Sequence, residues 1–242
     1  MKWFRVQVHL TSKQSPNLQN KKQRPKEAGG GPPTAVFIHF LLLGGKEMKV
    51  KEHFQTITYH RKLVREGCFK VGLYWQGLTH DLSKFSPAEF FVGAKYYQGD
   101  RSPNNAEKEA KGYSSSWLHH KGRNKHHFEY WIDYTMPGTS EKLLIGMKMP
   151  VRYVVEMFID RIAACKVYQK DAYTDASAWA YHQRSKRVQE VMHPESLALI
   201  DKLLKMLAEE GEAKTFAYTR KIVMKDKKDR LKNGIRLIKE LF

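Results

Sequence analysis

The chain has 242 residues, which is enough for one substantial domain with a full hydrophobic core. Its formal net charge of +18 at pH 7 fits either a solvated basic surface or one that attracts an anion such as a phosphate. Two cysteines, Cys68 and Cys165, exclude a disulfide framework and fit a reducing compartment. The apolar run of residues 35–43 is too short to cross a bilayer. We therefore expect a cytoplasmic protein that does not enter a membrane.

Residues 1–47 differ in composition from the rest of the chain. Residues 14–33 are polar, include a Gly-Gly-Gly-Pro-Pro run and show no helical or strand periodicity, which predicts a disordered leader. Gly44-Gly45-Lys46-Glu47 precedes Met48, and purine-rich codons for these residues would resemble a bacterial ribosome-binding site. We therefore expect Met48 to be the native start, and a native peptide from within residues 1–47 would contradict this.

Beyond the leader, the pattern predicts an all-α protein. Apolar and histidine residues at three- and four-residue steps predict a helix over residues 50–66 that ends at Gly67. A second helical segment, residues 68–84, carries a His-Asp pair near its C-terminal end. Ser86-Pro87-Ala88-Glu89 has the form of a capping box with proline at the first helical position, and it opens a third helix through Tyr97.

The second half of the chain continues the helical pattern. A helix over residues 106–121 is expected despite Gly112 and three serines, and a turn is expected around Pro137-Gly138. No alternation of apolar and polar residues persists long enough to predict a β-sheet. The remaining predicted helices cover residues 151–170, 176–191, 196–210 and 215–242. The last of them is basic, and its Val223, Leu231 and Ile235 are expected to pack on the domain while the lysines stay in water.

His80 and Asp81 form the dipeptide around which the other polar residues are arranged. The pair offers a metal ion one imidazole nitrogen and one carboxylate oxygen, which suits iron, manganese, zinc or magnesium. Alone it is weak evidence, because a chain with 11 histidines contains such neighbours by chance. A lone histidine such as His60 is likewise more often structural than a ligand. Four histidines, however, lie within nine residues, at positions His119, His120, His126 and His127.

The helix predicted over residues 151–170 carries two carboxylates, Glu156 and Asp160, one turn apart. They lie beside the apolar stripe and are flanked by aromatic and small apolar residues, which is not typical of a solvated face. Ion pairs with Arg152 or Arg161 are the structural alternative. We favour a site role for Asp160 and leave both interpretations open for Glu156.

These residues together resemble the HD-domain superfamily of metal-dependent phosphohydrolases. The shared order is a histidine on one helix, a His-Asp pair about twenty residues later, further histidines and a final aspartate on a later helix. The position of Lys84 after His80-Asp81 is similar to the His-Asp-x-x-Lys motif of the HD-GYP branch, although no Gly-Tyr-Pro follows. More narrowly, His-Asp-Leu-Ser-Lys-Phe-Ser-Pro and the later Trp-Leu-His-His block resemble a bacterial and phage family of uncharacterised HD-like proteins. The resemblance covers roughly residues 48–170 and implies an HD-domain-like helical bundle.

The resemblance assigns six residues to metal binding. The first site would be formed by His60, His80, Asp81 and Asp160. Superfamily members with two additional histidines hold a second ion, which His120 and His127 would bind here, with Asp81 as the bridge. The implied cofactor is one or two divalent ions of manganese, iron, zinc or magnesium.

The chemistry that the resemblance implies is hydrolysis of a phosphomonoester or phosphodiester, with a small nucleotide as the expected substrate. A bound divalent ion lowers the pKa of water from about 15.7 toward about 7. Lys84 and Arg123 would bind and stabilise the phosphoryl group, and His119 or His126 would protonate the leaving group. Glu156 would orient an imidazole ligand.

Two other functions stay open at this point. The same ligand order resembles the HD-fold diiron oxygenases, which would make the reaction oxygen-dependent. The second alternative is a non-catalytic basic helical protein that binds nucleic acid, with an affinity that survives the loss of Asp81. A homodimer through apolar helix faces is compatible with each of these functions.

Overall fold

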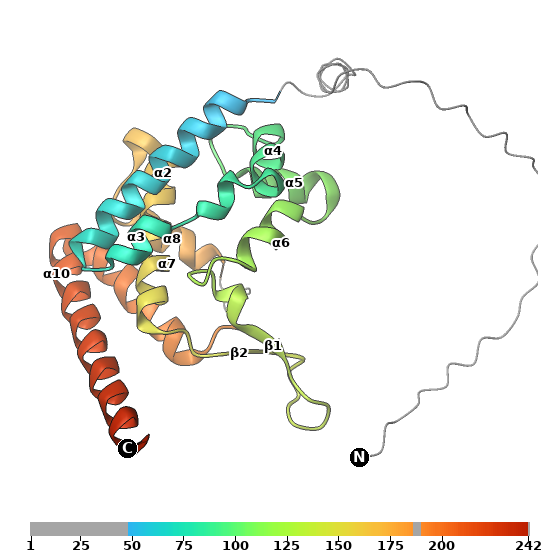
Figure 1. Cartoon of the computed structure of the whole chain (residues 1–242). Coiled ribbons are helices and arrows are strands. Elements are labelled where there is room, and N and C mark those ends of the chain that lie inside the picture. The colour runs from blue at the N-terminus through green and yellow to red at the C-terminus, as the bar shows by residue number, and fades with distance from the viewer. Residues whose placement is uncertain (1–47, 186–189, 242) are drawn as a thin grey trace, which may run out of the picture. The chain divides into compact units, whose positions relative to one another are not determined.

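The computed structural model describes residues 48–185 and 190–241, so the leader predicted over residues 1–47 lies outside the described residues. The predicted all-α class is confirmed (Figure 1). The α-helices are α2 (Val50–Lys70), α3 (Tyr74–Thr79), α4 (Pro87–Lys95), α5 (Pro103–Lys111), α6 (Ser115–Lys121), α7 (Val151–Gln169), α8 (Ser177–Arg184) and α10 (Pro194–Leu241). Short 3-10 helices are η1 (Leu82–Phe85), η2 (Phe128–Trp131) and η3 (Lys170–Ala172).

Helix α7 lies at the centre of the core, because it packs against both α2 and α10. Val155 and Phe158 on α7 are completely buried, as are Leu203 and Leu207 on α10. Burial of each such side chain stabilises the fold by roughly 1.5–3 kcal/mol. The apolar stripe predicted on residues 151–170 therefore forms the core, and it fixes the position of the two carboxylates beside it.

Helix α2 runs through Gly67 and ends three residues later, so the predicted end at Gly67 is wrong. Gly67 is buried against α7, where an added Cβ would lie 2.6 Å from Ile159 Cγ2. The glycine therefore allows close helix packing instead of ending the helix. The turn that follows α2 is made by Gly72, whose φ of 83° is in the left-handed region.

Gly67→Ala should lower the free energy of unfolding by about 1–3 kcal/mol, because the methyl group overlaps Ile159 and overpacks the α2–α7 contact. This loss outweighs the gain of about 1 kcal/mol in helix propensity. Urea denaturation measures the difference. Gly234→Ala is the matched control, since an added Cβ on that α10 residue meets no atom within 4 Å and should stabilise the protein slightly. A Gly67→Ala protein as stable as the Gly234→Ala protein would contradict the packing role.

The start of α4 has the expected backbone but not the expected capping box. Ser86 is the extended N-cap residue and Pro87 occupies the first helical position. The Ser86 side chain caps nothing, and the Glu89 carboxylate instead contacts two histidines of α6. The capping-box prediction is therefore wrong for the side chains, and Glu89 is available to the site.

The single helix predicted over residues 106–121 is in fact two helices, α5 and α6. Gly112, with a φ of 80°, ends α5, and the Ser114 hydroxyl accepts a hydrogen bond from Trp117 N at the start of α6. The carboxylate of buried Glu107 accepts hydrogen bonds from the Ser114 hydroxyl at 2.7 Å and the Ser115 hydroxyl at 2.8 Å. Glu107 thus ties α5 to the beginning of the helix that carries two of the candidate ligands.

Glu107→Gln should be destabilising near neutral pH and less so in acid. Burial alone would raise the pKa of Glu107, but hydrogen bonds from Ser114, Ser115 and Lys111 lower it below its usual value. A depressed folded-state pKa means that the ionised group stabilises the fold above the unfolded pKa of about 4.3. This contribution is lost as the pH falls through the folded-state pKa.

Urea denaturation at a series of pH values should show Glu107→Gln less stable than wild type by about 1–3 kcal/mol at pH 7. The difference should shrink as the pH falls below about 4. Glu109→Gln, a change at an exposed carboxylate on the same helix that pairs with Arg101 through both oxygens, is the control and should cost about 1 kcal/mol or less. A Glu107→Gln difference that stays constant down to the lowest pH at which wild type is folded would contradict this account.

The C-terminal part of the chain agrees with the prediction in outline. Helix α8 covers the first part of the helix predicted over residues 176–191, of which residues 186–189 lie outside the described residues. The helices predicted over residues 196–210 and 215–242 join in α10, which has a break at Gly211 and is described to Leu241. Val223 is buried as expected. Leu231 and Ile235 are exposed, so their predicted packing on the domain is wrong. Figure 1 shows the last turns of α10 extending past the other helices.

Two short strands were not predicted. β1 (Ile132–Tyr134) pairs antiparallel with β2 (Leu144–Gly146), and Pro137-Gly138 lies in the turn region between them. With three residues each, the strands are too short to show an alternating pattern. Among the described residues, no helix combines the length and the apolar character that crossing a bilayer requires.

Candidate metal centre

His80 and Asp81 lie in the bend between α3 and η1. Asp81 has a φ of 53°, a left-handed conformation that aspartate tolerates better than most residues. Arg61 on α2 holds the bend, because its Nε donates to His80 O at 2.8 Å and its Nη2 donates to Leu78 O at 3.1 Å. The side chains of His80 and Asp81 are both buried. The single helix predicted over residues 68–84 is therefore wrong, because residues 68–70 end α2, the chain turns at residues 71–73, and α3 stops before the residues that carry the chemistry.

The first cluster joins the four residues predicted for the first metal site. His60 from α2, His80, Asp81 and Asp160 from α7 place one ligand atom each within 4.8 Å of one another. Asp160 Oδ1 lies 3.0 Å from His60 Nε2 and 3.4 Å from His80 Nε2. Asp81 Oδ2 lies 3.3 Å from His80 Nε2. Residues spread over a hundred positions of sequence thus meet around one point.

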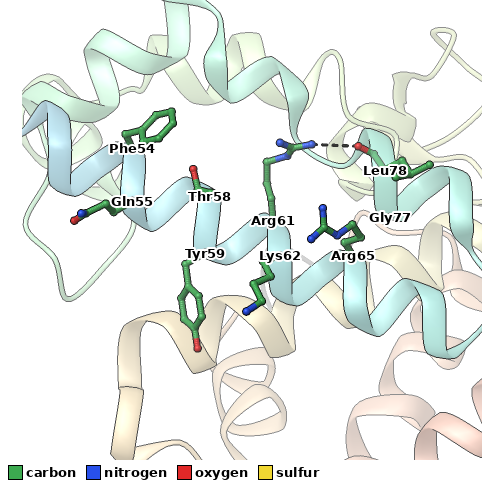
Figure 2. A pocket seen from close by; sticks show the side chains of 9 residues that line it. All are labelled: Phe54, Gln55, Thr58, Tyr59, Arg61, Lys62, Arg65, Gly77 and Leu78. Carbon is green, nitrogen blue, oxygen red and sulfur yellow. Dashed lines mark hydrogen bonds between the residues drawn. The ribbon is translucent and has the colours of Figure 1, made fainter.

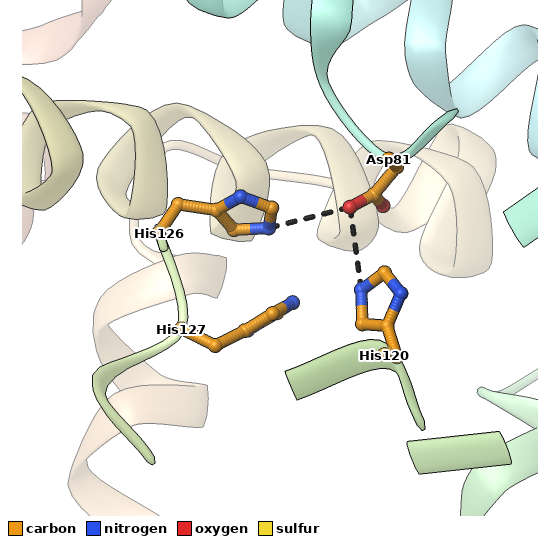
Figure 3. Close-up of side chains that lie close together, drawn as sticks. All are labelled: Asp81, His120, His126 and His127. Carbon is orange, nitrogen blue, oxygen red and sulfur yellow. Dashed lines mark ion pairs between the residues drawn. The ribbon is translucent and has the colours of Figure 1, made fainter. Parts of the chain in front are cut away.

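The second cluster shares Asp81 with the first and adds three histidines, His120, His126 and His127 (Figure 3). His120 comes from α6, and the other two come from the segment that follows it. Asp81 Oδ1 lies 3.2 Å from His120 Nε2 and 3.4 Å from His126 Nε2. His126, expected as a proton donor, therefore lies among the residues that could bind a metal ion, together with His127, which was expected as a ligand.

The centre contains buried polar atoms that make no hydrogen bond within the part of the chain that the structure describes. They are the Nε2 atoms of His126 and His127. The Asp81 oxygens have close neighbours instead, because Oδ2 lies 2.6 Å from Lys84 Nζ and Oδ1 lies 3.2 Å from His120 Nε2. Leaving a buried imidazole nitrogen without a partner costs roughly 1–3 kcal/mol. A divalent cation between the imidazole nitrogens and the carboxylate oxygens would satisfy them together. The buried His/Asp groups could therefore hold a metal ion.

Glu156 lies behind both clusters and contacts an imidazole of each. Its Oε1 is 2.9 Å from His80 Nδ1 and 3.1 Å from His126 Nδ1. A proton on each Nδ1 can be donated to this carboxylate, which leaves each Nε2 lone pair directed at the centre. Glu156, one turn before Asp160, could therefore orient these two imidazoles, as the resemblance implies. The same three residues, His80, His126 and Glu156, also form a third group that could hold a metal ion.

Glu89 has the same arrangement on the other side of the centre, and the sequence reasoning missed it. Its Oε2 is 2.7 Å from His120 Nδ1 and its Oε1 is 2.6 Å from His119 Nδ1. The Asn124 amide also lies beside His120 and donates to Ser83 Oγ at 2.8 Å. The signal that could have found Glu89 is the need of adjacent histidines for a carboxylate acceptor, which its place in a capping-box pattern concealed.

The remaining predicted site residues lie at the edge of the centre. Lys84 is partly exposed, and its Nζ is 2.6 Å from Asp81 Oδ2. Burial lowers the pKa of Lys84, but Asp81 and Asp160 more than offset this and raise it, so the ammonium is charged. His119 is partly exposed. Arg123 is exposed and donates to His119 O at 3.2 Å, a contact with the backbone of α6 and not with the centre.

The protonation states favour cation binding at His60, His127 and the carboxylates, whereas His80 and His120 must release a proton to bind a metal ion, because Asp81 and the other nearby carboxylates raise their pKa despite burial. Burial and Lys84 lower the pKa of His60, and burial with the neighbouring His126 lowers the pKa of His127 well below its usual value. Burial raises the pKa of Asp81 and Asp160, but the charges of His80 and Lys84 beside Asp81, and hydrogen bonds from His60 and His80 to Asp160, bring both well below the usual range. Neutral imidazoles and ionised carboxylates are the forms that bind metals.

The fold and the site together define an all-helical protein with a buried His/Asp centre that could hold metal. The chain belongs to a family of unknown function, DUF5662, whose model matches residues 49–206. This range contains every member of both clusters. No curated protein and no solved structure matches the sequence significantly. Membership of the HD-domain superfamily stays a prediction.

Proposed function

We propose that the protein is a metal-dependent phosphohydrolase with two divalent ions bridged by Asp81. The observation that carries the proposal is the division of the Asp81 carboxylate between the clusters. Oδ2 lies beside His80 at 3.3 Å, and Oδ1 lies beside His120 at 3.2 Å. A bridging carboxylate between two histidine-rich ligand sets is suited to two-metal hydrolysis of a phosphoester.

The donor set favours a transition metal over magnesium. The second cluster offers three imidazoles and one carboxylate, and imidazole ligands suit zinc and iron, whereas magnesium prefers oxygen. Such ions would supply an acidified water and a clamp for the attacking and leaving oxygens. Two ions rather than one are proposed because each cluster has four candidate ligands.

Lys84 is the residue of this chain best placed to bind the substrate. Its charged, partly exposed Nζ lies at the edge of the centre, next to Asp81 Oδ2. A phosphoryl oxygen could replace Asp81 as the partner of this ammonium when the carboxylate binds metal. His119, partly exposed and held by Glu89, is the candidate proton donor to the leaving group. The proposal that the substrate is a nucleotide rests on the HD-domain resemblance alone.

Hydrolysis of p-nitrophenyl phosphate and bis(p-nitrophenyl) phosphate tests the proposal, with manganese, iron or zinc added to the metal-free protein. We expect p-nitrophenol release that requires metal, proceeds without oxygen and is lost in Asp81→Ala. Lys84→Ala should retain metal but lose much of the activity. Turnover that consumes oxygen would favour the diiron oxygenase instead, and absence of metal binding would contradict both enzymatic functions.

A further inference from the structure

A basic groove runs along α2 and the end of α3 (Figure 2). It has a volume of about 450 Å³, and the side chains that matter below are Phe54, Tyr59, Arg61, Lys62, Arg65 and Leu78. With 3.6 residues per turn, Lys62 and Arg65 point about 140–160° away from His60 on α2. These two side chains therefore lie on the side of α2 opposite His60, whereas Arg61 reaches from the groove to the backbone of the metal centre.

The lining combines positive charge with exposed aromatic surface. Three of the nine lining residues are basic and none is acidic. Phe54, Tyr59 and Leu78 are all about half exposed. Trp75, three residues before Leu78 on the same face of α3, is 72% exposed, which is unusual for the largest apolar side chain. The neighbouring aromatic surface thus continues along α3.

We propose that this groove binds single-stranded nucleic acid. Aromatic rings on which unpaired bases stack, next to basic side chains that follow the phosphates, are the two features of sequence-tolerant single-strand binding. The groove's charge is complementary to a polyanion, and the formal net charge of +18 adds long-range attraction. A second copy of the chain fits poorly, because a symmetric contact would bring these basic side chains against themselves.

The basic side chains of the groove differ in the contacts they make. Arg61 donates to His80 O and Leu78 O, so it holds the bend of the metal centre. Lys62 lies 4.0 Å from Glu66, a loose and exposed ion pair that a phosphate can replace. Arg65 is exposed, and Figure 2 shows it beside Gly77 of α3. Lys62 and Arg65 are therefore the residues that contact phosphate, and they can be changed without disturbing the metal centre.

Fluorescence anisotropy of a labelled oligothymidylate, titrated with the full chain, tests the proposal. The variant Lys62→Glu/Arg65→Glu should bind about tenfold or more weakly than wild type. The slope of log affinity against log salt should become shallower by about 1.4, at about 0.7 for each phosphate contact on a single strand. Trp75→Ala should weaken binding by roughly tenfold through lost stacking.

Lys205→Glu/Lys221→Glu is the matched control, because it removes the same charge from exposed positions on α10. Lys205 also forms an exposed i,i+4 pair, 3.8 Å from Glu209, as Lys62 does with Glu66. This control should lose clearly less affinity than the groove variant. Equal losses in the two variants, wild-type binding by the groove variant, or a duplex bound as tightly as the single strand would overturn the proposal. The proposal does not rest on the phosphohydrolase activity, which the groove variant should retain toward p-nitrophenyl phosphate.

Discussion

Asp81→Ala should remove both metal ions from the protein, whereas Asp160→Ala and His120→Ala should each remove one. Asp81 is the member that the two clusters share, and its two oxygens face different sets of histidines. Asp160 belongs only to the first cluster and His120 only to the second. Metal content measured by inductively coupled plasma mass spectrometry after removal of loosely bound ions distinguishes the three variants. Hydrolysis by Asp81→Ala should fall to the metal-free background.

Asp133→Ala is the control for this series, because Asp133 is an exposed aspartate on β1. It should keep the metal content of the wild type. If Asp81→Ala retained one ion while Asp160→Ala lost both, Asp160 and not Asp81 would be the shared ligand.

Glu156→Gln should weaken metal binding by roughly 10- to 100-fold. This range is typical when a residue that hydrogen-bonds a metal ligand is substituted. The Glu156 Oε1 atom lies within hydrogen-bond distance of Nδ1 on both His80 and His126. Glutamine keeps the shape but removes the charge, so the imidazoles lose basicity and their fixed orientation. Because His80 and His126 belong to different clusters, both sites should be affected. Competition with a chelator of known affinity measures the change.

Glu89→Gln is the matched comparison for Glu156→Gln. Glu89 contacts His120, a member of the second cluster only, and His119. This variant should therefore weaken one site and leave the other unchanged. A Glu156→Gln protein with wild-type affinity at both sites would show that this carboxylate does not orient the ligands.

Much of the fold follows from periodicity, and the errors have local causes. The helix expected over residues 151–170 forms as α7 because its apolar stripe is continuous and buried. The sequence pattern predicts a helix end at Gly67, yet the glycine is there because α2 packs closely against Ile159. Conversely, the pattern predicts a helix that continues through Gly112, yet this glycine adopts a positive φ and ends α5. A glycine alone does not reveal which of these two uses it has.

In the candidate site, the residues on regular helices could be placed from the sequence, whereas those in irregular segments could not. Asp160 and Glu156 could be placed relative to each other because both lie on one regular helix. His126 and His127 lie in an irregular segment, where spacing does not fix the direction of a side chain. The choice of His127 over His126 therefore could not be made from the sequence, and the structure places both beside Asp81. The sequence does not reveal the role of Glu89, because this residue fits a local capping box. In the structure it contacts His119 and His120, which are about 30 residues away in the chain.

The metal content of the untagged wild-type protein is the most direct test of the central claim. Protein prepared in medium containing manganese, iron and zinc and then dialysed against metal-free buffer should retain about two transition-metal ions per chain, as a two-metal centre requires. Reloading the chelated protein with the same metal should also raise its thermal stability, because the ion binds the folded state. A chain that retains no metal, and whose stability none of the three ions raises, would contradict the metal centre and the phosphohydrolase function with it.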